Sequence, residues 1–211
     1  MYFCGLVGFQ FLPPMPHKRP HEHYAGRFKY LTYWNLIVQF LFFAGSCIVD
    51  LMKSTSSNQY KLTKIRDKLF GGIVLPYGVF VVFMFWGLYS FDRELIFPKA
   101  MDAMFPPWLN HVSHTVILPA LIIETYILKH RHPQRKEGFL YALAFGMAYF
   151  VWTLYLGLKM DIWVYPVLQI MSWSQRVPFL ILSIAGILFI YIIGERINAL
   201  FWGESVVNKS K

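Results

Sequence analysis

Five long apolar runs dominate this chain of 211 residues. They extend over residues 30–52, 69–91, 112–128, 139–158 and 177–193, and each approaches or exceeds the length of a helix that crosses a bilayer. Within lipid, helices satisfy all their backbone polar groups internally. Hydrophobic residues make up 56% of the chain and charged residues only 15%. The sequence therefore predicts an all-α, multi-pass transmembrane helical bundle with about five full spans.

Two shorter apolar segments lack the length of a span. Residues 162–170 contain Pro166, so we expect them at the membrane interface or in a re-entrant loop. Residues 1–14 lack the early basic residues and the cleavage site of a signal peptide, and we expect an interfacial or vestigial segment there. We therefore divide the chain into a short apolar segment with a basic linker (1–29), a helical membrane domain (30–203) and a polar tail (204–211).

The basic residues indicate how the spans are oriented. The net charge is +9, which we attribute to loops beside anionic lipid headgroups and not to nucleic-acid binding. Five spans divide the loops into two alternating sets, with twelve Lys and Arg in the set that contains the C-terminus and eight in the other. Because loops rich in Lys and Arg stay in the cytosol, we expect a cytosolic C-terminus. We expect the protein itself in the plasma membrane or the endoplasmic reticulum.

The first apolar run carries a polar stripe. At about 100° per residue, its polar side chains fall on one face of a helix, and lipid would penalise them there. They are Thr32, Asn35, Gln39, Ser46 and Asp50. Either these side chains face the bundle interior or a watery cavity, or they form hydrogen bonds that hold helices together, with Thr32 bonded to its own backbone.

A second polar group, formed by Asn110, His111 and His114, stands at the start of the third run. Two crossings separate this point from the start of the first run, so Thr32 and His114 are expected at similar depth below the outer or lumenal surface. A neutral imidazole can accept the proton of a hydroxyl at physiological pH. The pair can therefore act as nucleophile and base, although headgroups or loop carbonyls also satisfy interfacial histidines.

Few other side chains in the sequence are suited to catalysis or to binding a metal or cofactor. Glu124 lies ten residues after His114, which is about 15 Å deeper at roughly 1.5 Å per residue, so it cannot orient that imidazole. Cys4 and Cys47 indicate neither a disulfide framework nor a cysteine metal site, and the histidine pair lacks the further ligands of zinc or haem. The GxSxG elbow, the Walker loop and the dinucleotide fingerprint are missing from the sequence. We expect no metal and no cofactor.

Several short motifs accompany the threonine and the histidine. They are Gly26 with KYLT (29–32), RD (66–67), DRELIFPK (92–99), WLNH (108–111) with HT (114–115), WVYP (163–166) and GE (194–195). On these motifs, residues 26–203 resemble the androgen-induced gene 1 family. The resemblance implies hydrolysis of fatty acid esters of hydroxy fatty acids by a membrane enzyme whose threonine and histidine match Thr32 and His114. It also implies a sixth span before Thr32, where residues 1–14 stand, so we expect a shortened form.

On this interpretation, Thr32 attacks the internal ester carbonyl and His114 accepts its proton. Lys29 or Arg93 is then available for the free carboxylate of the substrate. The residues expected to bind substrate are Lys29, Asn35, Arg93, Asn110 and His111. The expected partners are the lipid substrate and membrane lipids, with no nucleic acid.

Two other functions fit parts of the sequence. A non-enzymatic transporter or channel would use the polar stripe, Glu124 and the runs that Pro76 and Pro119 interrupt. A regulatory membrane scaffold would carry no reactive threonine. A transporter binds its substrate near the bilayer midplane, whereas the esterase places its chemistry near one surface, and this difference separates them.

Overall fold

Helices make up the regular structure of this protein. The computed structural model describes residues 1–10, 24–51 and 57–203, and these ranges contain no β-strand. Its elements are α1 (Tyr2–Gln10), η2 (Gly26–Lys29), α2 (Leu31–Leu51), α3 (Ser57–Leu69), η3 (Phe70–Val74), α4 (Leu75–Asp92), η4 (Arg93–Leu95), η5 (Lys99–Met101), α5 (Pro107–His114), α6 (Ile117–Ile127), α7 (Arg135–Lys159), α8 (Pro166–Ile170) and α9 (Trp173–Trp202). The all-helical fold predicted from the sequence is confirmed. The expected polar tail, 204–211, lies outside the described residues.

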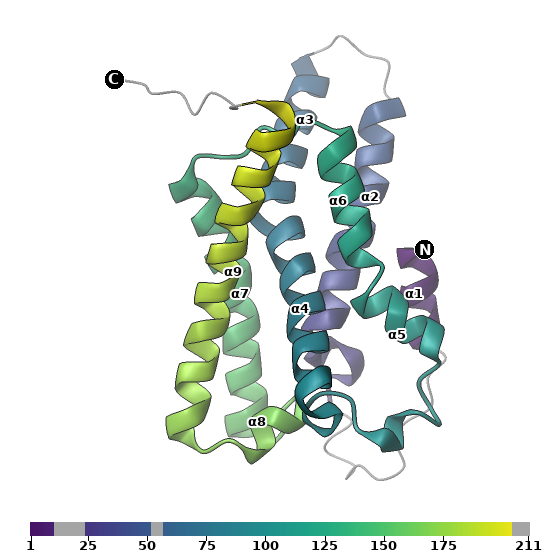
Figure 1. Ribbon diagram of the computed structural model, residues 1–211, viewed down its shortest axis with the longest axis vertical. Helices are drawn as coiled ribbons and strands as arrows, with labels where there is room; N and C mark the ends of the chain where they lie inside the picture. Colours follow the sequence, from purple (N-terminus) through teal and green to yellow (C-terminus); the bar gives the residue numbers. More distant parts are fainter. Residues whose placement is uncertain (11–23, 52–56, 204–211) are drawn as a thin grey trace.

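Four helices within the described ranges are long and apolar enough to cross a membrane. They are Leu31–Leu51, Gln59–Leu95, Arg135–Lys159 and Trp173–Trp202, and Figure 1 shows them side by side along the long axis of the molecule. Large apolar side chains remain exposed on these helices, as contact with lipid requires. Examples are Leu41, Ile48, Phe83, Ile181, Leu182 and Phe189. The chain is therefore a multi-pass helical membrane protein.

The span expected over residues 112–128 is divided into two short helices. α5 ends at His114 and α6 begins at Ile117. Pro119 explains the division, because it has no N–H to donate and its ring would clash with the helical carbonyl of Thr115, four residues earlier. The N–H groups of Thr115 and Val116 instead both donate to the carbonyl of His111. As a result His114 lies at the end of a helix, and four long spans are present where about five were expected.

Pro76 has a milder effect on the helix that contains α3 and α4. A π-helical turn, Phe70–Val74, joins these two helices without a break. Such a widened turn accommodates a residue that cannot donate to the helical ladder. The carbonyl of Val74 accepts a hydrogen bond from Gln39 Nε2 on α2, at 2.9 Å. One residue of the polar stripe therefore ties α2 to α4.

The N-terminal helix α1 packs against α2 and α5, as Figure 1 also shows. Two glycines of α1 allow this close approach. A Cβ atom at Gly5 would lie 2.9 Å from Cγ1 of Val112, and one at Gly8 would lie 3.2 Å from Cδ1 of Leu109. Because interiors are packed to near crystalline density, such contacts leave no room for larger side chains.

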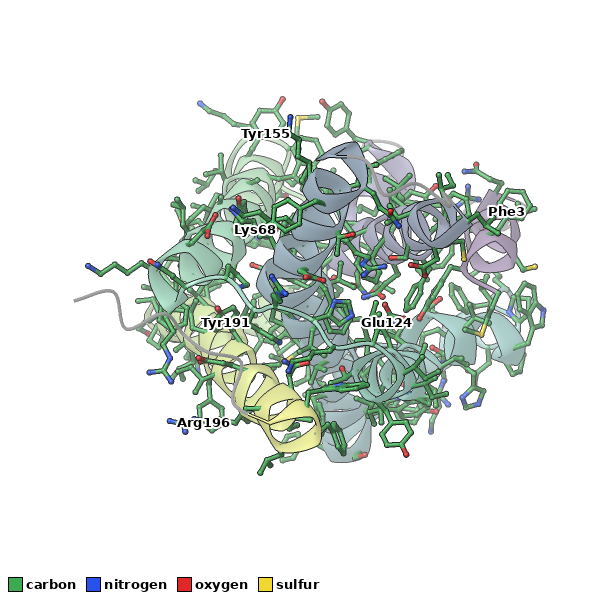
Figure 2. All side chains as sticks on the ribbon, turned by 90° about the horizontal axis from the view of Figure 1, so that it is seen from above. Phe3, Lys68, Glu124, Tyr155, Tyr191 and Arg196 are labelled. Atoms are coloured by element: carbon green, nitrogen blue, oxygen red, sulfur yellow. The ribbon has the colours of Figure 1, made fainter. Side chains whose placement is uncertain are left out.

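The two ends of the bundle differ in character. In Figure 1 the start of α2, the end of α4 and α8 lie at one end, and the ends of α2, α6 and α9 lie at the other. This second end holds a buried ionic cluster in which His130 lies between Asp67, at 3.0 Å, and Glu124, at 3.3 Å. Figure 2 looks down on this end and shows Glu124 inside the ring of helices, with Phe3 and Arg196 at its periphery.

Candidate active site

Thr32 and His114 meet at the first end of the bundle. Thr32 is the second residue of α2, and its Oγ1 lies 3.2 Å from Nε2 of His114, the last residue of α5. His114 is buried, and Thr32 is half-buried. The break between α5 and α6 places the imidazole at a helix terminus, from which it reaches α2. The structure thus brings together the two residues that the sequence placed at similar depth.

Asn110 fixes the tautomer of the imidazole. His114 Nδ1 lies 2.7 Å from Oδ1 of Asn110 and 3.1 Å from the backbone carbonyl oxygen of the same residue. A carbonyl oxygen only accepts hydrogen bonds, so Nδ1 carries the proton and donates it. The lone pair is then on Nε2, which accepts a hydrogen bond from the Thr32 hydroxyl. This is the arrangement that a general base requires.

Two aromatic residues of α4 hold the His114 ring and its backbone. The ring of Phe85 stacks on the imidazole, with the ring centroids 3.7 Å apart and the planes inclined by 12°. Trp86 Nε1 donates to the backbone carbonyl of His114 at 2.8 Å. The imidazole is therefore fixed by contacts on its face, its Nδ1 edge and its main chain.

A cavity of about 870 Å³ opens beside the pair, and both residues line it. This volume is near the upper end of the range for small-molecule sites. Its walls are mainly apolar and come from two groups of elements. Phe85, Phe97 and Met101 belong to α4 and the loop after it, and Phe150, Val167 and Ile187 belong to α7, α8 and α9. The cavity can accommodate a long apolar ligand whose polar group meets Thr32 and His114.

Two tyrosine hydroxyls reach the start of α2 from the other side of the cavity. Tyr149 on α7 and Tyr165, just before α8, both accept a hydrogen bond from the backbone N–H of Leu31, each at 3.0 Å. Both tyrosines line the cavity. They satisfy an N–H that the first turn of a helix leaves without an internal partner.

Of the other residues expected to bind substrate, Lys29 lines the cavity. Its side chain is buried, and its Nζ lies 5.5 Å from the centroid of the Tyr30 ring. Arg93 is directed elsewhere, because it forms an ion pair with Asp102 and donates to the carbonyl of Phe97. The structure thus brings one of the two expected cations to the cavity wall.

The expected polar residues take separate positions. Asn35 is fully buried and accepts a hydrogen bond within α2 from Gln39 Nε2 at 3.3 Å. His111 is exposed, and its Nδ1 lies 3.0 Å from Thr115 Oγ1. Neither residue is among those that line the described cavity. Asn110 contacts the His114 imidazole and is not among the residues that line the cavity.

Sequence reasoning missed the roles of Phe85, Tyr149 and Tyr165. Tyr165 stands in the WVYP motif, so a signal for it was present in the sequence. Phe85 and Tyr149 lie inside apolar runs that contain many aromatic residues, and no spacing distinguishes them from residues that face lipid. Their contacts depend on how the helices pack, which a single sequence does not reveal.

Comparison with known proteins places the chain in one family. The family model described as FAR-17a/AIG1-like protein matches residues 1–199. The androgen-induced gene 1 protein of Homo sapiens is 35% identical over 192 residues, which cover 86% of this chain and 80% of that protein. The androgen-dependent TFPI-regulating protein of Mesocricetus auratus is 37% identical over 207 residues, which cover 97% and 87%.

The human androgen-dependent TFPI-regulating protein is similarly close, at 37% identity over 182 residues, which cover 85% of this chain and 79% of that protein. No solved structure matches the fold. The family match extends over almost the whole helical domain and includes both Thr32 and His114. This chain belongs to the FAR-17a/AIG1-like family.

Proposed function

We propose that this protein is a membrane-embedded esterase that hydrolyses fatty acid esters of hydroxy fatty acids, with Thr32 as nucleophile and His114 as base. The observation that carries the proposal is the distance of 3.2 Å between Thr32 Oγ1 and His114 Nε2 on the wall of an apolar cavity. A hydroxyl, a base in the correct tautomer and a group that orients the base are the parts of an activated nucleophile. Asn110 is that orienting group.

The first half of the reaction acylates the enzyme. Thr32 Oγ1 attacks the ester carbonyl carbon while its proton passes to His114 Nε2. The tetrahedral intermediate collapses as Nε2–H protonates the oxygen of the leaving hydroxy fatty acid. The acyl chain is then esterified to Thr32, as in the serine enzymes that use a histidine base.

The second half releases the acyl chain. A water molecule gives its proton to His114 Nε2 and attacks the Thr32 ester. The second tetrahedral intermediate collapses when the same proton returns to Thr32 Oγ1, and a free fatty acid leaves. The Nδ1–H bond to Asn110 stabilises the imidazolium in both halves, since its acceptors face the charge that develops on the ring.

The cavity supports a substrate with two hydrocarbon chains. A branched ester has an acyl chain on one side of its carbonyl and a hydroxy fatty acid on the other, and apolar walls from two separate groups of helices line the space around Thr32. The hydroxy fatty acid also has a free carboxylate. Lys29, on the same wall, supplies a positive charge for it.

The polar residues that favoured a transporter have structural contacts instead. Asn35 and Gln39 bond to each other, and Gln39 also bonds to the carbonyl of Val74. Glu124 faces His130 at 3.3 Å. The bond from Gln39 to Val74 joins two helices, and the bond between Asn35 and Gln39 lies within α2. These contacts support the esterase over a transporter whose site lies at mid-membrane.

The test is covalent labelling of the purified chain in detergent. We expect a fluorophosphonate probe to form an adduct on the peptide that contains Thr32, as mass spectrometry would show. We also expect a palmitic ester of hydroxystearic acid to be cleaved, and Thr32→Ala to reduce cleavage by about 10³-fold or more.

Thr125→Ala is the matched control, because the Thr125 hydroxyl is also buried but donates to the carbonyl of Leu121 in its own helix. This variant should label and hydrolyse as the parent does. An adduct on a residue other than Thr32, or undiminished hydrolysis by a folded Thr32→Ala protein, would overturn the proposal.

A further inference from the structure

The hydroxyl groups of Tyr149 and Tyr165 share one donor at the start of α2. Leu31, which precedes the proposed nucleophile, donates its backbone N–H to both phenol oxygens, each at 3.0 Å. The two oxygens are 3.4 Å apart. The two tyrosines therefore accept the same hydrogen bond, and they differ in where their own protons go.

The proton of Tyr149 is used within the protein. Tyr149 donates to the carbonyl oxygen of Lys29 at 2.9 Å, a closer contact than its distance to the Tyr165 oxygen. A phenol has one proton to donate, so this bond exhausts the donor capacity of Tyr149. Tyr149 thus holds the segment between η2 and α2 in place through hydrogen bonds to Lys29 and Leu31.

The proton of Tyr165 is not used in the same way. The Tyr165 oxygen accepts from the backbone N–H of Leu31, one residue before Thr32, and Tyr165 and Thr32 both line the cavity. Among the described contacts, no carbonyl takes the proton of Tyr165 as Lys29 takes that of Tyr149. Tyr165 therefore presents an O–H donor to the cavity beside the reacting hydroxyl.

We infer that Tyr165 is a further catalytic residue, whose hydroxyl donates a hydrogen bond to the oxyanion that forms when Thr32 attacks the ester carbonyl. This inference rests on the proposed function. As the Thr32 Oγ1–C bond forms, the carbonyl π electrons move onto its oxygen, and the O–H of Tyr165 stabilises that negative charge without giving up its proton. Donors placed in advance around such an oxygen supply a large part of the rate enhancement in acyl transfer.

The surroundings of Tyr165 keep the phenol in place. The Arg176 guanidinium stacks on Trp163, 3.7 Å from the ring centroid, and its Nε donates to the carbonyl of Leu168 at 3.0 Å. These contacts fix the loop on both sides of Tyr165, and Pro166 restricts it further. Burial raises the pKa of Tyr165, so the phenol keeps its proton at physiological pH. A fixed, protonated donor is what preorganised stabilisation requires.

A matched pair of variants tests the inference. Tyr165→Phe and Tyr149→Phe each keep the ring and each remove one acceptor of the Leu31 N–H. With the palmitic ester of hydroxystearic acid, Tyr165→Phe should lower kcat by about 10²–10³-fold, the effect of removing one oxyanion donor, with KM little changed. Tyr149→Phe should lower kcat by less than about tenfold, and its effect should fall mainly on the temperature of unfolding.

A tyrosine analogue with a more acidic phenol distinguishes hydrogen-bond donation by Tyr165 from the packing of its ring. This experiment also tests the inference if Tyr165→Phe does not fold. Tetrafluorotyrosine at position 165 keeps the hydroxyl but loses its proton at lower pH. Hydrolysis by this protein should decline at a lower pH than in the parent, because a phenolate cannot donate. An unchanged pH profile would overturn the inference.

The outcomes distinguish this inference from the proposed function. If the parent chain hydrolyses the ester, Thr32→Ala does not, and folded Tyr165→Phe is as fast as Tyr149→Phe, the oxyanion role alone is wrong. If the parent chain neither hydrolyses the ester nor labels at Thr32, both are wrong. A loss of kcat confined to Tyr165→Phe supports both.

Discussion

Nδ1 of His114 lies 2.7 Å from the side-chain oxygen of Asn110, one turn earlier in α5. The backbone oxygen of Asn110 lies 3.1 Å from the same nitrogen. One residue therefore offers the imidazole two acceptors, where hydrolases with a catalytic triad use a separate carboxylate. Because both acceptors are neutral, the imidazole is oriented without a buried negative charge.

Asn110→Ala should reduce hydrolysis only in part. The backbone acceptor remains and preserves the tautomer, so the loss corresponds to one hydrogen bond, about tenfold in kcat. Asn110→Asp keeps an acceptor and should lose less than Asn110→Ala. His111→Ala is the control, since His111 is exposed on the same helix. If steady-state kinetics gave a lower kcat for His111→Ala than for Asn110→Ala, the assignment of Asn110 as the residue that orients His114 would be contradicted.

Thr32→Ala and His114→Ala should each abolish hydrolysis, and the double variant should be no less active than either. Residues that act as one unit show such non-additive losses. Thr32→Ser should keep part of the activity, because the hydroxyl survives while the methyl that restricts its rotamer is lost. Single-turnover rates of the four variants would measure this. Additive losses in the double variant would mean that the residues act independently.

Glu124→Gln should leave probe labelling of Thr32 intact while it lowers stability. Glu124 faces His130 in the buried cluster at the other end of the bundle, so its carboxylate does not orient His114. Weakening a buried contact to a charged group costs about 1–3 kcal/mol, which would appear as a lower unfolding temperature in detergent. A stable Glu124→Gln protein that no longer labels would show that the two ends are coupled.

Stability should fall as pH rises above about 6.5, the usual pKa of an unfolded histidine. Burial opposes the charge of His130, but hydrogen bonds and charges from Asp67 and Glu124 outweigh it and raise the pKa of His130. The folded state therefore holds a proton that the unfolded state releases, and this contribution is complete below pH 6.5 and lost through the raised pKa. Burial lowers the pKa of His132 to about 4, so His132 adds nothing in this window.

The measurement is the unfolding temperature in detergent between pH 6.5 and 9, for the parent and for His130→Gln. The parent should lose stability over this range, and the variant should be less stable at pH 6.5 but nearly independent of pH. A parent whose unfolding temperature rises with pH would show that His130 is neutral in the folded state.

Residues 53–68, most of which form α3, should be cytosolic, and the loop that follows α4 should be outside or lumenal. The asymmetry of basic residues predicts this orientation. In a background without Cys4 and Cys47, a cysteine at Tyr60, which is exposed on α3, should react with an impermeant reagent only after permeabilisation. A cysteine at Met101, in η5, should react in intact cells if the protein is at the plasma membrane. Labelling of both positions from one side would exclude this topology.

Hydrophobic length alone was enough to predict the helical membrane bundle. The runs that became α2, α4, α7 and α9 are apolar over the distance that a bilayer imposes, and no other regular structure suits them there. The run at 112–128 has similar composition, yet Pro119 divides it. Pro76 stands in an equally apolar run without breaking it, because a π-helical turn compensates. Which outcome follows a proline depends on neighbouring helices and not on the run itself.

In the site, too, the sequence predicted some features, and others depend on how the helices pack. Equal depth predicted that Thr32 and His114 could meet, since depth follows from counting residues along two helices. Asn110 stands four residues before His114, so the sequence placed both on one helix face, but it did not show which group orients the imidazole. The contact between Asn110 Oδ1 and His114 Nδ1 is seen only in the structure. Arg93 shows most clearly what the sequence could not predict. It was expected to bind substrate, but it forms an ion pair with Asp102 instead.

If Thr32 and His114 act as proposed, the close approach of α1 to α5 gives two glycines of α1 an influence on turnover. Helix α5 carries the base at its end, and Gly5 and Gly8 set how near α1 lies to its other face. A larger side chain at either glycine would displace α5 as a rigid rod and lengthen the gap between nucleophile and base. Because 1 Å of misplacement can cost about a hundredfold in rate, Gly5 and Gly8, which are not among the residues that line the cavity, would control the rate of the proposed hydrolysis.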